Sequence, residues 1–351
     1  MPEKIKVLIV DDSAYMRVVL KDMLESDPGI SVVGSAKDGV EAIEKVKTLA
    51  PDVVLLDIQM PKMDGIATLQ RIMKESPART VMLSAMDKVD DQLPLRALEM
   101  GAVDFISKPS GPVSVDIVHF TGKIVEIVKI AAEAKMDVLR RTREPLQTKK
   151  VLSIKKEAFK GHKVVVIGAS TGGPRALEIV FAALPRDIPA SFIVVQHLPS
   201  EFSASFAKRL DAAKGPKVVL ACEGDRVEKG VAYLAPGDRH VRLSWKGASS
   251  LVLKLDDGEP VNFVRPSVDV LFRSAAESIG QNLMAVILTG MGVDGTAGAM
   301  VVKASGGRVV VQDEHSSVAY SMPKSAIDAG LADQVLPLDR IAEEIVRFLQ
   351  E

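Results

Sequence analysis

Cysteine, histidine and aromatic residues are all scarce in this chain. Its 351 residues include one cysteine, Cys222, and five histidines, and aromatic residues make up 4%. A single cysteine excludes an intrachain disulfide framework and any metal site built from a cysteine cluster. No apolar run approaches the roughly 20 residues that a membrane-spanning helix needs, so we expect no insertion into a membrane. The few histidines also leave a short list of candidate catalytic bases.

A strong charge of either sign is also missing. The net charge is −1, so the chain as a whole has no electrostatic bias toward nucleic acid. The start, Met1-Pro-Glu-Lys4, leads into an apolar strand pattern without the features of a signal peptide. With the single cysteine, this favours a cytoplasmic location. Hydrophobic residues make up 47%, and the length allows two globular domains, each with its own core.

Between residues 5 and 108, short apolar runs alternate with amphipathic stretches. The helical stretches include Ala14–Leu24 and Val40–Leu49. The predicted strands are Ile5–Val10, Ile30–Val33, Val53–Leu56, Thr80–Leu83 and Val103–Ile106. This α/β alternation predicts a five-stranded parallel, doubly wound sheet of flavodoxin-like type, in which function sits at the carboxyl ends of the strands.

A long helix and a polar basic stretch follow. Residues 113–143 have apolar side chains at helical spacing, and Glu144-Pro-Leu-Gln-Thr-Lys-Lys150 is typical of a solvated linker. A basic run could also bind an acidic partner, although a connector is the simpler interpretation. We therefore predict a first domain at 1–125, a helical and basic linker at 126–160, and a second domain at 161–351.

From residue 163 the alternation resumes. Helices fit Pro174–Ala183, Phe202–Ala212, Val268–Ile279 and Gly295–Ala304. The predicted strands are Lys163–Ile167, Ser191–Gln196, Lys217–Leu220, Ala232–Leu234, Val241–Leu243, Leu251–Leu255, Ala285–Leu288, Arg308–Val311 and Gln334–Leu336. This pattern predicts a second α/β domain, with a Rossmann-like, mostly parallel sheet and a β-hairpin insertion.

Charged and hydroxyl side chains end the strands of the first domain. Asp11 and Asp12 follow the first strand, Asp57 ends the third, Ser84 the fourth, and Lys108 follows the fifth. Clustered carboxylates need a cation, and their hard oxygen atoms favour Mg²⁺ at Asp11, Asp12 and Asp57. Asp57 could then attack a phosphoryl group, with Lys108 and Ser84 contacting the phosphoryl oxygens. The alternative for any single carboxylate is a helix N-cap.

This region resembles the receiver domain of two-component response regulators. The motifs that carry the resemblance are Asp11-Asp12-Ser13, Leu56-Asp57-Ile-Gln-Met-Pro61, Met63-Asp64-Gly65, Ser84-Ala85 and Lys108-Pro109. The resemblance implies that Asp57 is the phosphoacceptor and that a histidine kinase is the phosphodonor. It also implies a cis bond between Lys108 and Pro109. Phe105 stands where many receivers have tyrosine.

The second domain opens with a strand, a glycine-rich turn and a helix. Gly168-Ala-Ser-Thr-Gly172 matches the G-x-S-x-G pattern, and Pro174 suits the first turn of a helix. Such a turn can expose a nucleophilic serine, Ser170, beside helix N–H groups that stabilise an oxyanion. It can also bind a phosphate or simply reverse the chain. The absence of a following Gly-Lys-Ser/Thr argues against a nucleotide P-loop.

A nucleophilic serine needs a base and an orienting acid. His197 ends the next strand and should face the same sheet edge as Ser170, although it could instead cap or pack a loop. Asp294 follows another strand in a glycine-rich turn, where an N-cap of the next helix is the alternative. Nearby glycines could expose the Met291 N–H to an oxyanion. The remaining histidines are His240, ranked second as base, His315, ranked third, His162, at the wrong edge, and His119, in the linker helix.

The whole chain resembles the chemotaxis receptor methylesterase family. The motifs are Gly168-Ala-Ser-Thr-Gly-Gly173, Val195-Gln-His-Leu-Pro199, Ala235-Pro-Gly-Asp-Arg-His240, Arg265-Pro-Ser-Val-Asp269 and Leu288-Thr-Gly-Met-Gly-Val-Asp-Gly295. The resemblance implies Ser170 as nucleophile, His197 as base and Asp294 as acid, with Met291 and Thr171 in support. It implies a protein-glutamate methylesterase without a cofactor at the esterase site, and a glutaminase activity in the same site. The substrates would be glutamates and glutamines on the cytoplasmic helices of chemoreceptors.

Three rival interpretations remain at this point. A DNA-binding response regulator would need a basic recognition helix, which the near-neutral balance disfavours. A small-molecule serine hydrolase with a switch domain would prefer generic esters over receptor. A pure interaction module would leave Ser170 unreactive toward serine-directed reagents.

Overall fold

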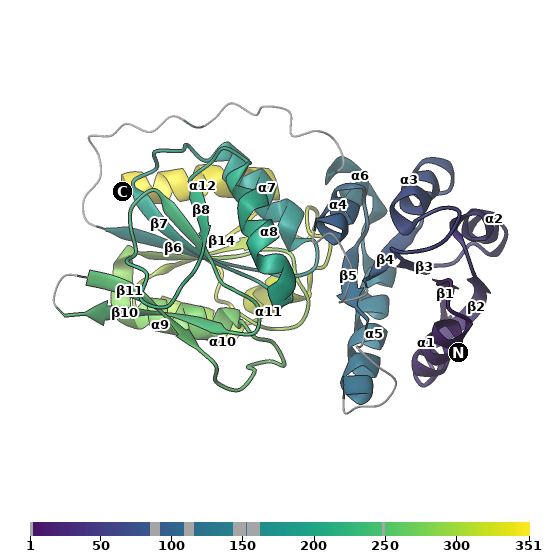
Figure 1. The fold of residues 1–351 in the computed structure, drawn as a ribbon. Helices are drawn as coiled ribbons and strands as arrows, with labels where there is room; N and C mark the ends of the chain where they lie inside the picture. Colours follow the sequence, from purple (N-terminus) through teal and green to yellow (C-terminus); the bar gives the residue numbers. More distant parts are fainter. Residues whose placement is uncertain (1–2, 85–91, 109–115, 143–151, 153–161, 248–249) are drawn as a thin grey trace. The chain divides into compact units, whose positions relative to one another are not determined.

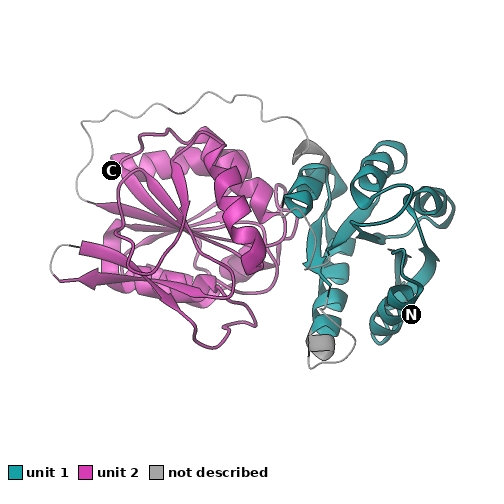
Figure 2. Ribbon diagram, viewed as in Figure 1, with its two compact units in different colours: residues 1–144 teal, residues 145–351 magenta. Residues whose placement is uncertain are grey.

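The computed structural model describes residues 3–84, 92–108, 116–142, 152, 162–247 and 250–351. Residues Met1–Glu144 and Pro145–Glu351 form two compact units, shown in different colours in Figure 2. The division falls within the predicted linker at 126–160, whose polar basic part lies outside the described residues. None of the helices in the described ranges has the length and apolarity that crossing a bilayer requires.

The N-terminal unit is a five-stranded sheet in the order β2-β1-β3-β4-β5, and its strand pairs are parallel. Its strands are β1 (Ile5–Val10), β2 (Ile30–Ala36), β3 (Val53–Asp57), β4 (Arg79–Ser84) and β5 (Asp104–Ser107). Its helices are α1 (Ala14–Glu25), α2 (Gly39–Leu49), α3 (Gly65–Glu75), α4 (Leu93–Glu99), α5 (Asp116–Glu133) and α6 (Met136–Thr142). Helix α1 packs with α5, and α2 packs with α3, as expected for a doubly wound sheet (Figure 1). The predicted parallel sheet is confirmed.

The single helix predicted for residues 113–143 is wrong, because the described part of this range forms two helices. Helix α5 ends at Glu133 and α6 begins at Met136. At the break, the Ala134 carbonyl accepts a hydrogen bond of 2.8 Å from Arg79 Nε at the start of β4. A residue 55 positions earlier thus fixes the chain at this point. The local apolar spacing gives no sign of this contact.

The C-terminal unit has a seven-stranded sheet in the order β14-β13-β12-β6-β7-β9-β8, again with parallel pairs. Its strands are β6 (Lys163–Ala169), β7 (Ala190–Gln196), β8 (Lys217–Leu220), β9 (Val231–Leu234), β12 (Leu283–Ile287), β13 (Arg308–Gln312) and β14 (Gln334–Leu336). Strands β10 (His240–Lys246) and β11 (Ser250–Asp256) form a separate antiparallel hairpin. The predicted parallel sheet with an inserted hairpin is therefore confirmed.

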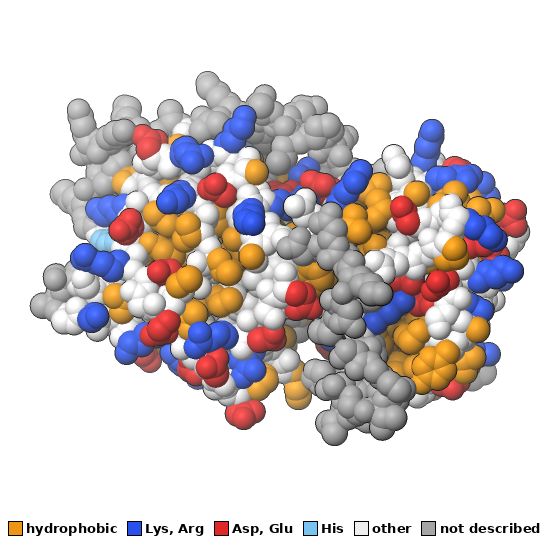
Figure 3. Space-filling view, in the orientation of Figure 1, with side chains coloured by type: hydrophobic (Ala, Val, Ile, Leu, Met, Phe, Trp, Pro, Cys, Tyr) orange, Lys and Arg blue, Asp and Glu red, His pale blue; other side chains and the backbone are white. Residues whose placement is uncertain are grey.

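Two groups of helices pack against this second sheet. One group is α7 (Gly173–Ala183), α8 (Ser200–Asp211) and α12 (Leu338–Gln350), and the other is α9 (Val268–Ile279), α10 (Thr296–Ala304) and α11 (Ser321–Asp328). A short 3-10 turn, Gly280–Asn282, follows α9. Helices α11 and α12 were not among the predicted elements. On the face shown in Figure 3, acidic and basic side chains of each unit are interspersed rather than gathered by sign.

The register of the parallel strands brings three loops to one edge of the second sheet. Ala169 at the end of β6 pairs with Gln196 at the end of β7, and Gly168 pairs with Ile287 at the end of β12. The residues that follow these strands therefore leave the sheet side by side. This edge contains Ser170, His197 and the turn that leads to Asp294.

Candidate active site

The N-terminal unit has an acidic pocket at the carboxyl edge of its sheet. Asp11 and Asp57 are buried, and the ammonium of Lys108 lies 2.7 Å from Asp11 Oδ2 and 2.8 Å from Asp57 Oδ2. Burial raises the pKa of Asp57, an effect that Lys108 only partly offsets. Although burial acts in the opposite direction, the charges of Asp57 and Asp11 raise the pKa of Lys108. The lysine therefore stays charged and neutralises a pair of buried carboxylates.

The same pocket fits a divalent cation and a phosphoryl group. One oxygen from each of Asp11, Asp12 and Asp57 lies within 4.8 Å of the others, and carboxylate oxygens are the ligands that Mg²⁺ prefers. The Ser84 hydroxyl is buried and has no hydrogen-bond partner within the described residues. A phosphoryl oxygen on Asp57 could satisfy it. The predicted cis bond between Lys108 and Pro109 lies outside the described residues.

Ser170 lies in the sharp turn between β6 and α7. Gly172 has a left-handed backbone (φ 76°), which a residue without a Cβ adopts at no steric cost, and α7 then begins with Gly173-Pro174. The Ser170 N–H donates to the Thr289 carbonyl over 3.1 Å. Gly290 is so close that a Cβ added to it would lie 2.9 Å from the Ser170 Cβ. The turn after β12 therefore packs directly against the serine.

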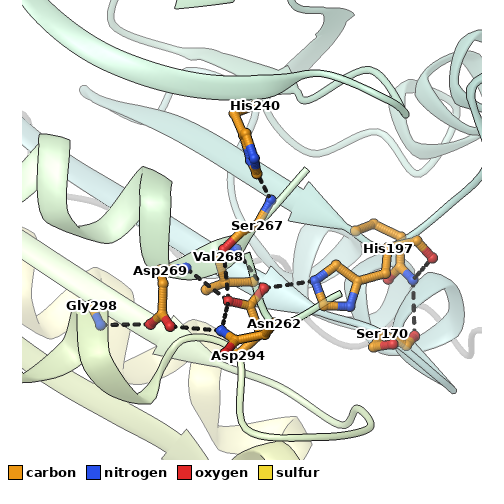
Figure 4. A network of polar contacts seen from close by, with 10 residues as sticks. Ser170, His197, His240, Asn262, Ser267, Val268, Asp269, Asp294 and Gly298 are labelled. Carbon is orange, nitrogen blue, oxygen red and sulfur yellow. Dashed lines mark hydrogen bonds and ion pairs between the residues drawn. The ribbon is translucent and has the colours of Figure 1, made fainter. Parts of the chain in front are cut away.

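His197 follows β7 and is tied to the serine turn through its neighbour. The amide of Gln196 donates to the carbonyls of Ser170 (2.9 Å) and His197 (3.2 Å), so one buried side chain links the two backbones. Adjacent strand backbones lie about 4.8 Å apart. Ser170 and His197 directly follow two paired residues, so their backbones start from about that separation. His197 Nε2 lies 2.9 Å from Asp294 Oδ2, and Ser170 lies on the far side of the ring in Figure 4.

A hydrogen bond between the Ser170 hydroxyl and the imidazole is not among the contacts of the described residues. Catalytic contacts of this kind are often long before substrate binds. Because Asp294 accepts a hydrogen bond from Nε2, the lone pair available for a base belongs to Nδ1 of His197. The structure thus brings His197 and Asp294 into contact and places Ser170 beside them.

Asp294 is buried and accepts five hydrogen bonds. Oδ2 accepts from His197 Nε2 and from the Val268 N–H, at 2.9 and 2.7 Å. Oδ1 accepts from Ser267 Oγ, Asn262 Nδ2 and the Asp269 N–H, at 2.8, 3.0 and 3.1 Å. Although burial favours the neutral acid, the hydrogen bond and charge of His197, together with the other donors, lower the pKa of Asp294. The carboxylate is therefore held ionised.

The alternative of a local N-cap does not describe Asp294. Helix α10, which follows it, has Gly295 at its N-cap and no side-chain capping bond. Asp294 instead accepts the N–H groups of Val268 and Asp269 in the first turn of α9. The positive end of the α9 dipole favours a negative charge there.

The turn after β12 has the features of an oxyanion site. The N–H groups of Gly290 and Gly292 donate to the Ala319 carbonyl and to Ser321 Oγ, at 3.0 and 3.1 Å. The Met291 N–H between them has no hydrogen-bond partner within the described residues. Thr171 is buried, and its carbonyl accepts a hydrogen bond of 2.9 Å from Thr289. Thr171 thus connects the serine turn to the turn that contains Met291.

The other described histidines are placed differently. His240 is buried, with Nδ1 accepting the Ser267 N–H at 3.1 Å and Nε2 donating to the Glu259 carbonyl at 3.0 Å. Both of its ring nitrogens are therefore engaged in supporting loops. His162 lies at the start of β6 and contacts Ser191 Oγ, and burial lowers its pKa. His315 is exposed, and the side chain of His119 lies outside the described residues.

Four side chains that the sequence did not mark as functional surround the site. They are Gln196, Asn262, Ser267 and Asp269. Three of them fall within the quoted motifs that contain His197 and Asp269, so a signal for them was present. Nothing in the local pattern pointed to Asn262.

The two sheets, with the acidic pocket at the edge of one and the Ser170, His197 and Asp294 site at the edge of the other, describe a response-regulator receiver joined to an α/β enzyme domain.

Comparison with known proteins identifies the family. Residues 165–345 match the family model "CheB methylesterase", and residues 7–116 match "Response regulator receiver domain". The chain belongs to the CheB methylesterase family. It is 42% identical over 350 residues to a protein-glutamate methylesterase/protein-glutamine glutaminase of Pyrococcus horikoshii, covering 100% of this chain and 95% of the relative.

Two further similarities come from Thermotoga maritima. A protein-glutamate methylesterase/protein-glutamine glutaminase of that organism is 44% identical, over 98% of each chain. The crystal structure of the Thermotoga maritima CheB methylesterase catalytic domain matches with a TM-score of 0.52 and 44% identity. The match covers 54% of this chain and 99% of that one.

Proposed function

We propose that the chain is a phosphorylation-activated serine hydrolase that demethylates glutamate methyl esters on chemoreceptors, for adaptation in chemotaxis. It would also deamidate glutamines there. The contact of 2.9 Å between His197 Nε2 and the buried Asp294 carboxylate, next to the turn that presents Ser170, carries the proposal. The names of the relatives at 42–44% identity, protein-glutamate methylesterase/protein-glutamine glutaminase, support the choice of substrate.

In the proposed reaction, His197 Nδ1 takes the proton of the Ser170 hydroxyl, and the oxygen attacks the γ-carbonyl of the substrate. Asp294 stabilises the imidazolium that forms. The imidazolium returns its proton to the departing methoxide, so methanol leaves and an acyl-serine remains. Water, deprotonated by His197, then hydrolyses the acyl-enzyme and restores the serine. An amide substrate would release ammonia in the same way.

The negative oxygen of the tetrahedral intermediate would be stabilised by backbone N–H groups. The Met291 N–H has no partner within the described residues and belongs to the turn that packs on Ser170. Thr171, at the start of the helical turn, would assist from the other side. This esterase site would need no cofactor.

The N-terminal unit would act as the switch. A chemotaxis histidine kinase would be the phosphodonor and Asp57 the acceptor, with Asp11, Asp12 and Asp57 holding Mg²⁺. When bound, the metal ion would neutralise the charge of the transferring phosphoryl group. Lys108 and the Ser84 hydroxyl, which has no hydrogen-bond partner among the described residues, would bind its oxygen atoms. The protein would work in the cytoplasm, on the cytoplasmic helices of receptors.

We further propose that the unphosphorylated receiver, at 1–125, restrains the catalytic domain at 161–351 through the connecting segment at 126–160. Phosphorylation would shift the population toward an accessible site. Deleting residues 1–150 should then raise basal methanol release. Loss of all activity in a fragment that still folds would reject this form of regulation.

Methanol release from purified methylated receptor, with and without a small phosphodonor, tests the function directly. Ser170→Ala should abolish release and leave phosphorylation of Asp57 intact. Asp57→Asn should keep basal release and lose the stimulation by phosphodonor. Release by Ser170→Ala at the wild-type rate would remove Ser170 from the mechanism. Faster turnover of generic esters than of receptor would favour a small-molecule hydrolase.

A further inference from the structure

Two buried aspartates cap each other's helices in the C-terminal unit. Asp294 precedes α10 but accepts the N–H groups of Val268 and Asp269 in the first turn of α9. Asp269 belongs to α9 but accepts the Gly298 N–H in the first turn of α10, at 2.6 Å. Each carboxylate thus satisfies N–H groups that the other helix leaves without an intrahelical partner. This reciprocal arrangement brings two negative charges close together in a buried place.

The amide of Asn262 lies between these two carboxylates. Its Nδ2 is 2.8 Å from Asp269 Oδ2 and 3.0 Å from Asp294 Oδ1. Both hydrogen bonds are drawn as dashed lines in Figure 4. A primary amide has two N–H donors, so one side chain can bond both acids at once. Burial, together with the charge of Asp294, raises the pKa of Asp269, whereas the pKa of Asp294 is lowered. The amide therefore bonds two neighbouring acids whose pKa values are shifted in opposite directions.

An unusual backbone places this amide in the site. Asn262 and Phe263 have φ angles of 55° and 63°, in the left-handed region that asparagine tolerates better than most residues. Val261 and Val264 close the turn with two reciprocal hydrogen bonds of 3.1 Å. The Phe263 side chain is 91% exposed. The turn thus sends one side chain to the buried acids and the next one to solvent.

We propose that Asn262 is a positioning residue, whose amide keeps the Asp294 carboxylate oriented toward His197. This inference rests on the proposed hydrolase function of the same site. The donors from α9 and Ser267 hold Asp294 from the backbone side, and Asn262 adds the contact that also ties down Asp269. Without the amide, the two carboxylates would face each other with no donor shared between them. The energetic cost would fall on the orientation of Asp294.

Charged and titratable groups from several elements surround Asp294 and its partners. His197 contacts it directly from the end of β7, and Asp269 faces it from α9. Arg273 acts on Asp269 through its charge, and His240 supports Ser267 through the backbone N–H. An aspartate at position 262 would be a third acid in this buried place, and like-charge repulsion would keep at least one of the three protonated. The variant therefore replaces the two donors of the amide by at most one, so Asp269 and Asp294 could no longer both be bonded from position 262.

Three variants of the full-length chain separate the amide from the loop. Asn262→Gly keeps the left-handed backbone and removes the amide. Asn262→Asp keeps the side-chain shape and replaces two donors by an acid. Phe263→Asn is the matched control, since it changes the adjacent left-handed residue, which is 91% exposed, and asparagine suits that backbone.

The assay is methanol release from methylated receptor as a function of pH, with Ser170→Ala as the zero. We expect Asn262→Gly to lower kcat about ten- to hundredfold, the range for a buried hydrogen bond to a charged group, with KM nearly unchanged. Asn262→Asp should also lower kcat about tenfold or more, because its carboxyl group has at most one donor. Phe263→Asn should leave kcat within about twofold of the wild-type value. A kcat for Asn262→Gly within twofold of wild type, or an equal loss in Phe263→Asn, would overturn the proposal.

Proton NMR gives a readout that does not depend on turnover. The His197 Nε2–H that Asp294 accepts should resonate at low field in wild type and in Phe263→Asn, and this resonance should move upfield or vanish in Asn262→Asp. A resonance at the wild-type position in Asn262→Asp would overturn the role of Asn262 even if no substrate were ever turned over. If wild-type protein released no methanol but the resonance moved as expected, the proposed function would fail while the positioning role stood. If Asn262→Gly failed to fold by circular dichroism, the isosteric aspartate variant would decide alone.

Discussion

Replacing Asp294 with asparagine should damage both stability and activity, because the side chain serves as acceptor for five donors. An amide keeps one acceptor oxygen and turns the other into a donor. If the nitrogen takes the place of Oδ2, it faces His197 Nε2 and the Val268 N–H. If it takes the place of Oδ1, it faces the three donors on that side, which include the Asp269 N–H. Either orientation sets donors against donors in a buried site.

The magnitude follows from the number of donors left without an acceptor. Each buried unsatisfied group costs about 1–3 kcal/mol, so two of them should lower the free energy of unfolding by about 2–6 kcal/mol. The rate should fall further, because the imidazole loses the group that fixes its tautomer. The corresponding change in a serine protease triad lowers kcat about 10⁴-fold, and we expect at least about 10³-fold here.

Urea unfolding and methanol release on the same preparations measure the two effects. Asp257→Asn is the matched control, because the Asp257 side chain is 72% exposed and pairs with Arg239 at the surface. It should change the free energy of unfolding by less than about 0.5 kcal/mol. An Asp294→Asn variant with wild-type stability, or with kcat within tenfold of wild type, would refute the reasoning.

The pH dependence supplies an independent check on the sign. Since folding lowers the pKa of Asp294, its ionised form stabilises the fold. That contribution is fully present above the pKa of an unfolded aspartate, about 4, and is lost as pH falls through the lower folded value. The stability difference between wild type and Asp294→Asn should therefore shrink below about pH 4. A difference that grows on acidification would contradict the assignment.

Three further perturbations test the two sites. Lys108→Ala leaves Asp11 and Asp57 without their shared cation, so thermal melts should show a free energy of unfolding lower by about 3 kcal/mol. Added Mg²⁺ should stabilise this variant more than it stabilises wild type. Asp57→Asn removes a carboxylate whose pKa burial raises, so the receiver should be more stable than wild type at pH 7, with the difference vanishing below about pH 4. Gly290→Ala would place a Cβ 2.9 Å from the Ser170 Cβ, so kcat should fall at least about tenfold, and unchanged turnover would disprove that contact.

The strands were predictable because their signal is local. Runs such as Ile5–Val10 and Lys217–Leu220 are bounded as expected, since buried parallel strands are continuous apolar segments that end at polar residues. Parallel pairing then brings the residues after these strands to one edge. For this reason the sequence alone predicts that Ser170 and His197 lie at the same edge. Their catalytic roles remain predictions.

The parts that could not be predicted depend on contacts between distant segments. The break between α5 and α6 is fixed by Arg79, and apolar spacing contains no information on that partner. Asn262 reaches the acids only because Asn262 and Phe263 both take left-handed backbone angles. Asparagine tolerates such angles, but a phenylalanine gives no indication of them in the sequence. Such a turn becomes visible only when the loop is closed against the rest of the fold.

The reciprocal capping explains why stability and catalysis should be hard to separate in this domain. An acid that only oriented a histidine could be moved or neutralised at little structural cost. Asp294 also holds the first turn of α9, as Asp269 holds the first turn of α10, so the two helices depend on the same pair of charges. Because α9 packs on β6, whose end leads into Ser170, a loss of charge at Asp294 would loosen the nucleophile as well as the base. Selection for a stable helix pair and selection for an ionised catalytic acid would therefore favour the same residue.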